Sequence, residues 1–147
     1  MWPFVAALQP EGKSVETKSS ETYDTLCADL VMAIVSVNKW SLRKTFSIFF
    51  SLESEGLTDF RRVRRWTPES IRLRLVRAGY KRGEFLENLV ANRLLAASVE
   101  LTEDKLGALL AASASRDVSQ IHTILESVPG IGPVVIEKFI SLSKKGQ

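Results

Sequence analysis

The sequence predicts an all-α domain, and three observations support this. Apolar residues recur at spacings of three and four residues along most of the chain from Thr22 onward. No segment shows the alternation of apolar and polar residues that is typical of a strand. Residues that favour helix starts and helix ends occur at short intervals along the same stretch. We therefore expect about seven or eight helices with short connections and no sheet.

Length and composition fit a single globular domain. The chain has 147 residues, of which 45% are hydrophobic and 25% are charged. Residues 1–20 contain two prolines and a stretch rich in Ser, Thr, Lys and Glu from Lys13 to Ser20, so we expect an N-terminal arm followed by a helical domain over residues 21–147. No apolar run approaches the roughly 20 residues that span a bilayer. The N-terminus also lacks the features of a signal peptide, so we expect a cytoplasmic protein without membrane contact.

Three helices and one helical turn are expected in the first half of the domain. An apolar stripe predicts the first helix: Tyr23, Leu26, Cys27, Leu30, Ile34 and Val37. Ser41 can cap the second helix, and Gly56 should end it or lie just beyond its end. Four of its residues should be buried: Leu42, Phe46, Phe49 and Phe50. A turn of helix should follow over residues 59–65. Thr67-Pro68-Glu69 then combines an N-cap, a proline at the first helical position and an acid, and Gly79 should end that helix.

Four further helices are expected after Gly79. A long helix should run from Tyr80 to about Ser98, with five apolar residues on it: Phe85, Leu86, Leu89, Val90 and Leu94. Thr102 should open the next helix, and Asp117 should cap the one after it. The last helix should begin at Pro133 and end at about Lys144. Helix starts and helix surfaces account for the isolated aspartates Asp29, Asp59, Asp104 and Asp117.

Side chains suited to metal binding or catalysis are scarce. Cys27 is the one cysteine, and it lies among apolar residues where it should behave as a small core residue. A disulfide within the chain and a four-cysteine iron–sulfur cluster are excluded by this count. His122 is the one histidine, and no Ser/His/Asp constellation accompanies it. We therefore expect no metal held by side chains, no cofactor of that kind and no catalytic residues.

Basic residues are concentrated in one segment. The net charge is only +3, but nine Lys or Arg residues and a single acid, Glu69, lie between Arg61 and Arg82. A merely solvated face usually mixes both signs, so a surface for a polyanion is the sharper interpretation. A solvated helix face and an acidic protein partner are the alternatives. The candidate contacts are Arg61, Arg62, Arg64, Arg65, Arg74, Arg77, Lys81 and Arg82.

The most informative motif is Val128-Pro129-Gly130-Ile131-Gly132, which joins two amphipathic segments. The two glycines remove side chains that would hold a ligand away from the backbone, and they permit positive φ. Pro133 suits the first helical position, so the next free amides, those of Val134 and Val135, point out of a helix N-terminus. Ile131 should fix the turn to the core. Glycine and helix amides together predict an anion site, and the alternative is a plain αα-hairpin.

This pattern of apolar-Pro-Gly-apolar-Gly between two helices resembles the helix–hairpin–helix motif of DNA repair and replication proteins, over residues 118–144 or so. The resemblance implies that the amides of Gly130, Gly132 and Val134 bind a DNA phosphate, with Lys138 one turn further on. It also implies a monovalent cation, Na+ or K+, held by the carbonyls of Glu126, Val128 and Ile131.

A wider resemblance involves two upstream segments. Residues 78–83, with Phe85, Leu86 and Leu89 after them, are similar to a helix start in base-excision DNA glycosylases. Residues 29–36 resemble the helix before the substrate-facing loop of those enzymes. Residues from about 22 to 144 thus resemble the six-helix barrel of the helix–hairpin–helix glycosylase superfamily. The resemblance places Asn38-Lys39-Trp40 in the loop that inserts a side chain into the gap left by a flipped base, with Asn38 as the wedge. Trp40 either stacks on a base or anchors the loop to the core.

The departures from that superfamily concern catalysis. Val134 stands where bifunctional members carry a nucleophilic lysine, and valine cannot form a Schiff base. The aspartate of monofunctional members would fall beyond Gln147, and the cluster-binding cysteines are missing. We therefore expect a catalytically inactive relative that binds duplex DNA, damaged or abasic, without sequence specificity, alone or with a protein partner. An active glycosylase with unconventional or partner-supplied residues and a protein–protein scaffold remain the alternatives.

Overall fold

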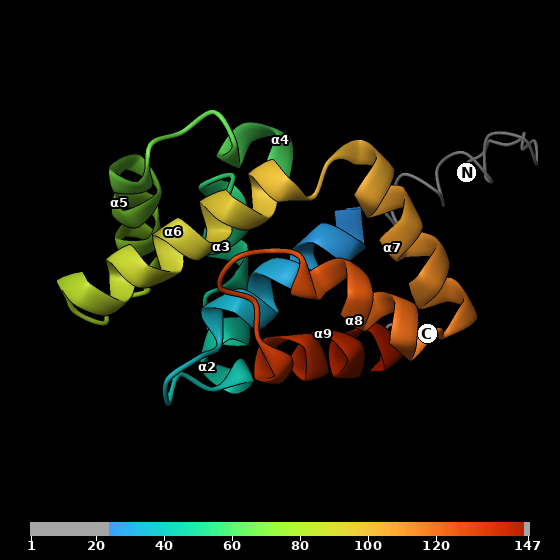
Figure 1. Cartoon of the computed structure of the whole chain (residues 1–147). Coiled ribbons are helices and arrows are strands. Elements are labelled where there is room, and N and C mark those ends of the chain that lie inside the picture. The colour runs from blue at the N-terminus through green and yellow to red at the C-terminus, as the bar shows by residue number, and fades with distance from the viewer. Residues whose placement is uncertain (1–23, 146–147) are drawn as a thin grey trace, which may run out of the picture.

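The computed structural model describes residues 24–145, with side chains through residue 143, so the predicted arm over residues 1–20 lies outside it. The described residues contain nine helices and no strand, which confirms the all-α prediction (Figure 1). A first helix covers residues 24–35. It is followed by α2 (Leu42–Ser47), α3 (Phe49–Ser54), α4 (Phe60–Val63), α5 (Pro68–Ala78), α6 (Glu84–Glu100), α7 (Glu103–Ser115), α8 (Val118–Glu126) and α9 (Pro133–Lys145).

The predicted capping residues begin and end several of these helices. The hydroxyl of Thr67 accepts a hydrogen bond from the amide of Ser70 at 3.1 Å, and Gly79 ends α5 with a φ of 108°. Thr102 caps α7 and Asp117 caps α8 through side-chain oxygens. Because these signals act within a few residues, the sequence was sufficient to predict these boundaries.

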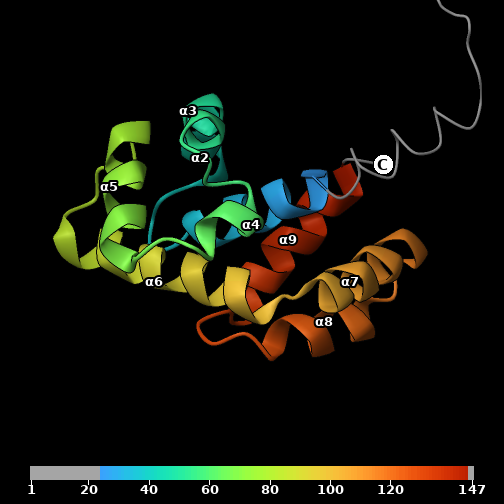
Figure 2. The ribbon, with the colours of Figure 1, turned by 90° about the horizontal axis from the view of Figure 1, so that it is seen from above.

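The first helix lies at the centre of the core. All residues from Leu30 to Val35 are buried, and so is Cys27, as predicted. The helix lies beside α9 in both views of the ribbon (Figures 1 and 2). Asp29 is also buried, with 9% of its surface exposed, so its assignment to a helix surface was wrong. Burial raises the pKa of the Asp29 carboxyl to about 6, because desolvation disfavours its charged form.

Two predictions of helix position were wrong. The expected second helix is divided at Ile48 into α2 and α3, with Ile48 at φ −113° and ψ 12°. The faces of two short helices do not align as one stripe, so Phe46 and Phe50 are 51% and 81% exposed. The long helix begins at Glu84, not at Tyr80, because Gly79 and Gly83 both take positive φ and turn the chain. Phe85 is consequently 78% exposed.

Tyr80 holds this turn to the core. Its side chain is fully buried, and its hydroxyl donates a hydrogen bond to the carbonyl of Val35 at 2.8 Å. Burial is the main reason that the pKa of Tyr80 is raised. The contact ties the start of α6 to the end of the first helix, where the loop of residues 36–40 begins.

Candidate nucleic-acid interface

The hairpin between α8 and α9 has the predicted boundaries within one residue. Gly130 takes a φ of 87°, whereas Gly132 is not in the positive-φ region, so only Gly130 uses the freedom expected of both. Ile131 is 6% exposed and its amide donates to the carbonyl of Val128 at 3.2 Å, which fixes the turn to the core. Val128 therefore already uses one lone pair of its carbonyl, and a second remains for a cation.

Unpaired amides lie at the start of α9. The carbonyl of Gly132 accepts the first hydrogen bond of this helix, from the amide of Ile136 at 3.1 Å. Within residues 24–145, the amides of Gly130, Gly132, Val134 and Val135 donate no hydrogen bond outside regular helix pairing. Val134 is 64% exposed beside them. The first turn of a helix leaves such amides free and carries partial positive charge, which favours an anion.

An open groove of about 540 Å³ brings this hairpin together with two other parts of the chain. One wall is the loop after the first helix, and another is Arg93 from the middle of α6. Figures 1 and 2 both show the hairpin beside α6. The described residues that line the groove include no carboxylate: Val37, Asn38, Arg93, Gly130, Ile131, Gly132, Pro133, Val134, Val135 and Lys138.

The loop of residues 36–40 is held by cationic side chains. The ammonium group of Lys138 donates a hydrogen bond to the carbonyl of Ser36. Arg82 donates to the carbonyl of Val37 at 2.6 Å and also to that of Asn38. These three carbonyls follow the C-terminal end of the first helix, where the helix dipole favours positive charge. Lys138 and Arg82, both predicted to contact DNA, thus each have a bond that positions the loop.

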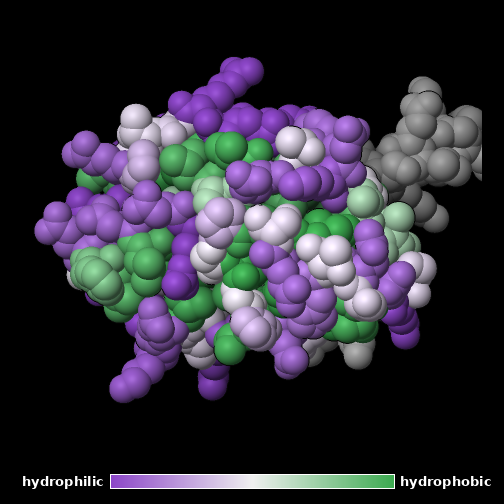
Figure 3. All heavy atoms as spheres, in the orientation of Figure 1, coloured by the Kyte–Doolittle hydropathy of each residue, from purple (hydrophilic) through white to green (hydrophobic). Residues whose placement is uncertain are grey.

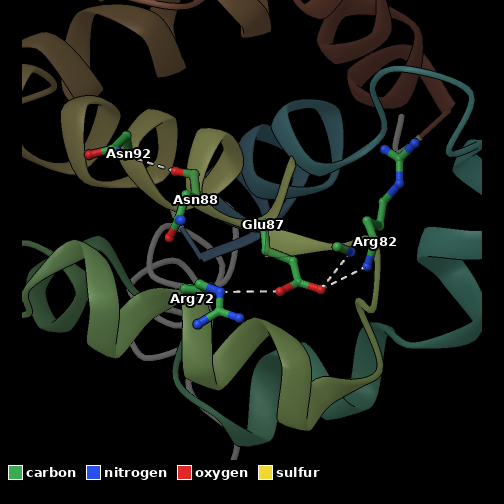
Figure 4. A network of polar contacts seen from close by, with 6 residues as sticks. Arg72, Arg82, Glu87, Asn88 and Asn92 are labelled. Carbon is green, nitrogen blue, oxygen red and sulfur yellow. Dashed lines mark hydrogen bonds and ion pairs between the residues drawn. The ribbon is translucent and has the colours of Figure 1, made fainter. Parts of the chain in front are cut away.

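A buried carboxylate positions Arg82 in turn (Figure 4). Glu87 is 5% exposed and accepts hydrogen bonds from the amides of Arg82 and Gly83, both at 2.9 Å. Its other oxygen pairs with the Nε of Arg72 at 3.2 Å. A buried charge is tolerated when it is fully hydrogen-bonded, as here. A chain of contacts therefore runs from α5 through the start of α6 to the loop in the groove.

Asn38 and Lys39 take positive φ values of 52° and 75°, and both are exposed. Asn38 lines the groove and Lys39 does not. Trp40 packs against the core instead, with its ring edge-on to Tyr80 at 4.9 Å and Arg82 over its face at 5.6 Å. Of the two roles considered for Trp40, anchoring the loop is the one that matches this position.

The basic segment is less free than its sequence indicates. Arg77 pairs with Glu55 at 2.8 Å, and Arg74 lies 3.8 Å from the same carboxylate. The hydrogen bond from Arg77 is the main reason that the pKa of Glu55 is lowered. Arg61 pairs with Glu103 at 3.2 Å. The acids that the segment lacks therefore come from elsewhere in the chain.

Other members of the basic segment lie against the protein surface. Arg62 lies over the ring of Trp66 at 5.6 Å, and Arg74 lies over it at 3.9 Å. The Nε of Arg64 donates to the carbonyl of Phe60. Arg65 and Lys81 are exposed. None of these residues lines the groove, so the structure does not bring the basic segment and the hairpin together in one site.

Arg93 was not among the predicted site residues. It is a single cation within an apolar stretch of α6, between the buried residues Ala91 and Leu94. This isolation was the one feature of the sequence that could have drawn attention to Arg93, because a charged side chain among core residues must either reach solvent or pair with another group. The sequence does not indicate that the Arg93 side chain extends toward the hairpin.

Within residues 24–145, no group of three His, Cys, Asp or Glu side chains is placed to bind a metal ion. In the same part of the chain, no helix combines the length and apolar character required to cross a membrane. Comparisons with protein-family models, curated proteins and solved structures found no match for this chain.

Proposed function

We propose that this protein binds duplex DNA through its phosphates, without sequence specificity, and that the hairpin before α9 is the centre of the site. The observation that carries the proposal is the groove itself. It combines free helix N-terminal amides, two cationic side chains and no carboxylate among its described lining residues. Backbone amides at a helix N-terminus bind phosphate oxygens without reading bases, so the expected binding is independent of sequence.

We further propose that the protein is a catalytically inactive relative of base-excision glycosylases. Val134 has no nucleophilic atom, and Lys138 has its ammonium hydrogen-bonded to Ser36. No Asp, Glu, Cys or His is among the described residues that line the groove. An active glycosylase would therefore need a group from a partner or from DNA itself. Release of a damaged base by the purified chain would refute this part of the proposal.

The test of DNA binding uses Val134→Glu. This position is 64% exposed in the first turn of α9, where an acid interacts favourably with the helix dipole and leaves folding intact. The same acid repels a phosphate at the hairpin. Val118→Glu is the matched control, because Val118 is 44% exposed in the first turn of α8 and does not line the groove.

The measurement is fluorescence anisotropy of labelled intact and abasic duplexes over a salt series. Salt-sensitive binding that Val134→Glu abolishes and Val118→Glu retains supports the proposal. A preference for the abasic duplex would place the activity in repair. Absence of binding at low salt, or equal binding by both variants, refutes it.

A protein–protein scaffold is the second candidate, and exposed phenylalanines favour it. Phe50 and Phe85 are 81% and 78% exposed, and Phe46 is 51% exposed. Figure 3 shows apolar side chains reaching the surface among hydrophilic ones. Contact of these rings with another protein would remove their apolar surface from water, which favours association. Sedimentation of the wild type against a Phe50→Ser, Phe85→Ser variant tests self-association through these residues.

A further inference from the structure

Arg93 has a defined position over the hairpin. A methyl group built on Gly130 would lie 2.9 Å from the Cγ of Arg93, 3.4 Å from its Nε and 3.5 Å from its Cδ. The stem of Arg93 therefore crosses the Gly130 backbone in van der Waals contact. The residue lines the groove, and its surface is partly exposed.

The guanidinium of Arg93 has no ion pair or hydrogen bond with the described residues. This separates it from the other cations nearby. Lys138 is bonded to Ser36, and Arg82 is bonded to Val37 and Asn38. Lys138 thus has one of its three N–H donors engaged, whereas Arg93 makes no such bond and presents its donors in a planar fork that matches phosphate oxygens.

We propose that Arg93 is the side-chain ligand of the DNA phosphate that the hairpin amides bind, and that Lys138 acts as a positioning residue for the loop of residues 36–40. This inference rests on the proposed function. The ligand is a phosphodiester oxyanion, which receives the guanidinium fork from α6 and amide donors from the start of α9. Binding at this phosphate then depends on two elements that are far apart in the sequence.

The test uses three variants of the full chain that separate the charge of Arg93 from the shape of its side chain. Arg93→Met keeps an unbranched stem over Gly130 and removes the charge, whereas Arg93→Lys keeps the charge and removes the fork. Lys105→Met is the matched control, because Lys105 is an exposed cation in the first turn of α7 and does not line the groove. Anisotropy of a labelled duplex is measured for each at several salt concentrations, beside Val134→Glu.

Each neutralised phosphate adds about 0.9 to the slope of log affinity against log salt. Arg93→Met should therefore lower the magnitude of that slope by about 0.9 and weaken binding at low salt about tenfold. Arg93→Lys should retain the wild-type slope with weaker binding, and Lys105→Met should match the wild type in both.

Three outcomes would overturn the proposal, and they can be told apart. If Val134→Glu abolishes binding but Arg93→Met matches Lys105→Met, the hairpin binds DNA and the role of Arg93 is refuted. Weakened binding by Arg93→Met with an unchanged slope refutes it in the same way, because only folding or packing was altered. If the wild type does not bind, or Val134→Glu has no effect, the proposed function and this inference are both refuted.

Discussion

Substitution of Gly130 by alanine tests the described hairpin geometry without any ligand. Gly130 has a φ of 87°, and an added Cβ would lie 2.9 Å from Arg93 Cγ. The left-handed region costs an L-residue about 1–2 kcal/mol. Displacing the Arg93 stem adds to this, so we expect Gly130→Ala to lower the free energy of unfolding by about 2–3 kcal/mol in total.

Gly132→Ala is the matched control, two residues away in the same turn. Gly132 is outside the positive-φ region, and a Cβ there would meet no atom within 4 Å. Alanine caps a helix less well than glycine but restricts the unfolded chain, so the two effects should nearly cancel, within about 0.5 kcal/mol.

Urea unfolding followed by circular dichroism measures both variants. With a urea m-value of about 2 kcal/mol/M, Gly130→Ala should lower the midpoint by about 1 M, and Gly132→Ala should leave it nearly unchanged. Equal midpoints for the two variants, or a larger loss in Gly132→Ala, would refute the assigned backbone geometry and the contact with Arg93.

Three further predictions concern buried groups. In Glu87→Gln, the backbone amides of Arg82 and Gly83 and the Nε of Arg72 lose their carboxylate acceptor. The free energy of unfolding should fall by about 1–3 kcal/mol. A thermal melt identical to that of the wild type would contradict this. The folded-state pKa of Asp29, raised to about 6 from 3.8, makes its ionised form unfavourable for folding. This cost is absent below pH 4, grows between pH 4 and 6, and reaches at most about 3 kcal/mol at 1.4 kcal/mol per pKa unit. Asp29→Asn should therefore stabilise the protein at pH 7 but not at pH 4 in urea titrations, and a pH-independent difference would contradict the assignment. Burial raises the pKa of Cys27 to about 12, so iodoacetamide should label it only after unfolding, and rapid labelling of the native protein at pH 8 would show that it is accessible.

The sequence was informative wherever a structure depends on neighbouring residues. Thr67, Gly79, Thr102 and Asp117 set helix ends through bonds to amides or carbonyls a few residues away. The hairpin around Gly130 is of the same kind, and its limits were predicted within one residue. Interactions of this range follow from residue type and order alone.

Features that depend on tertiary contacts were not predicted. The basic segment contains a single acid in the sequence, yet Glu55, Glu87 and Glu103 pair with its arginines from outside the segment. Arg93 reaches the hairpin for the same reason, because the packing of α6 decides its neighbours. The exposure of Phe85 follows from two glycines that delay the start of α6. Neither these contacts nor the exposure of Phe85 is marked by residues at a fixed spacing in the sequence.

The most direct test of the central claim is a 1H–15N correlation titration of the labelled protein with a DNA duplex. The account predicts that the amides of Gly130, Gly132, Val134 and Val135 shift together, saturate with DNA and return as salt is added. Pro133 has no amide and gives no signal. Saturable shifts confined to other elements such as α7, with the hairpin amides unmoved, would contradict the claim that the hairpin binds the phosphate.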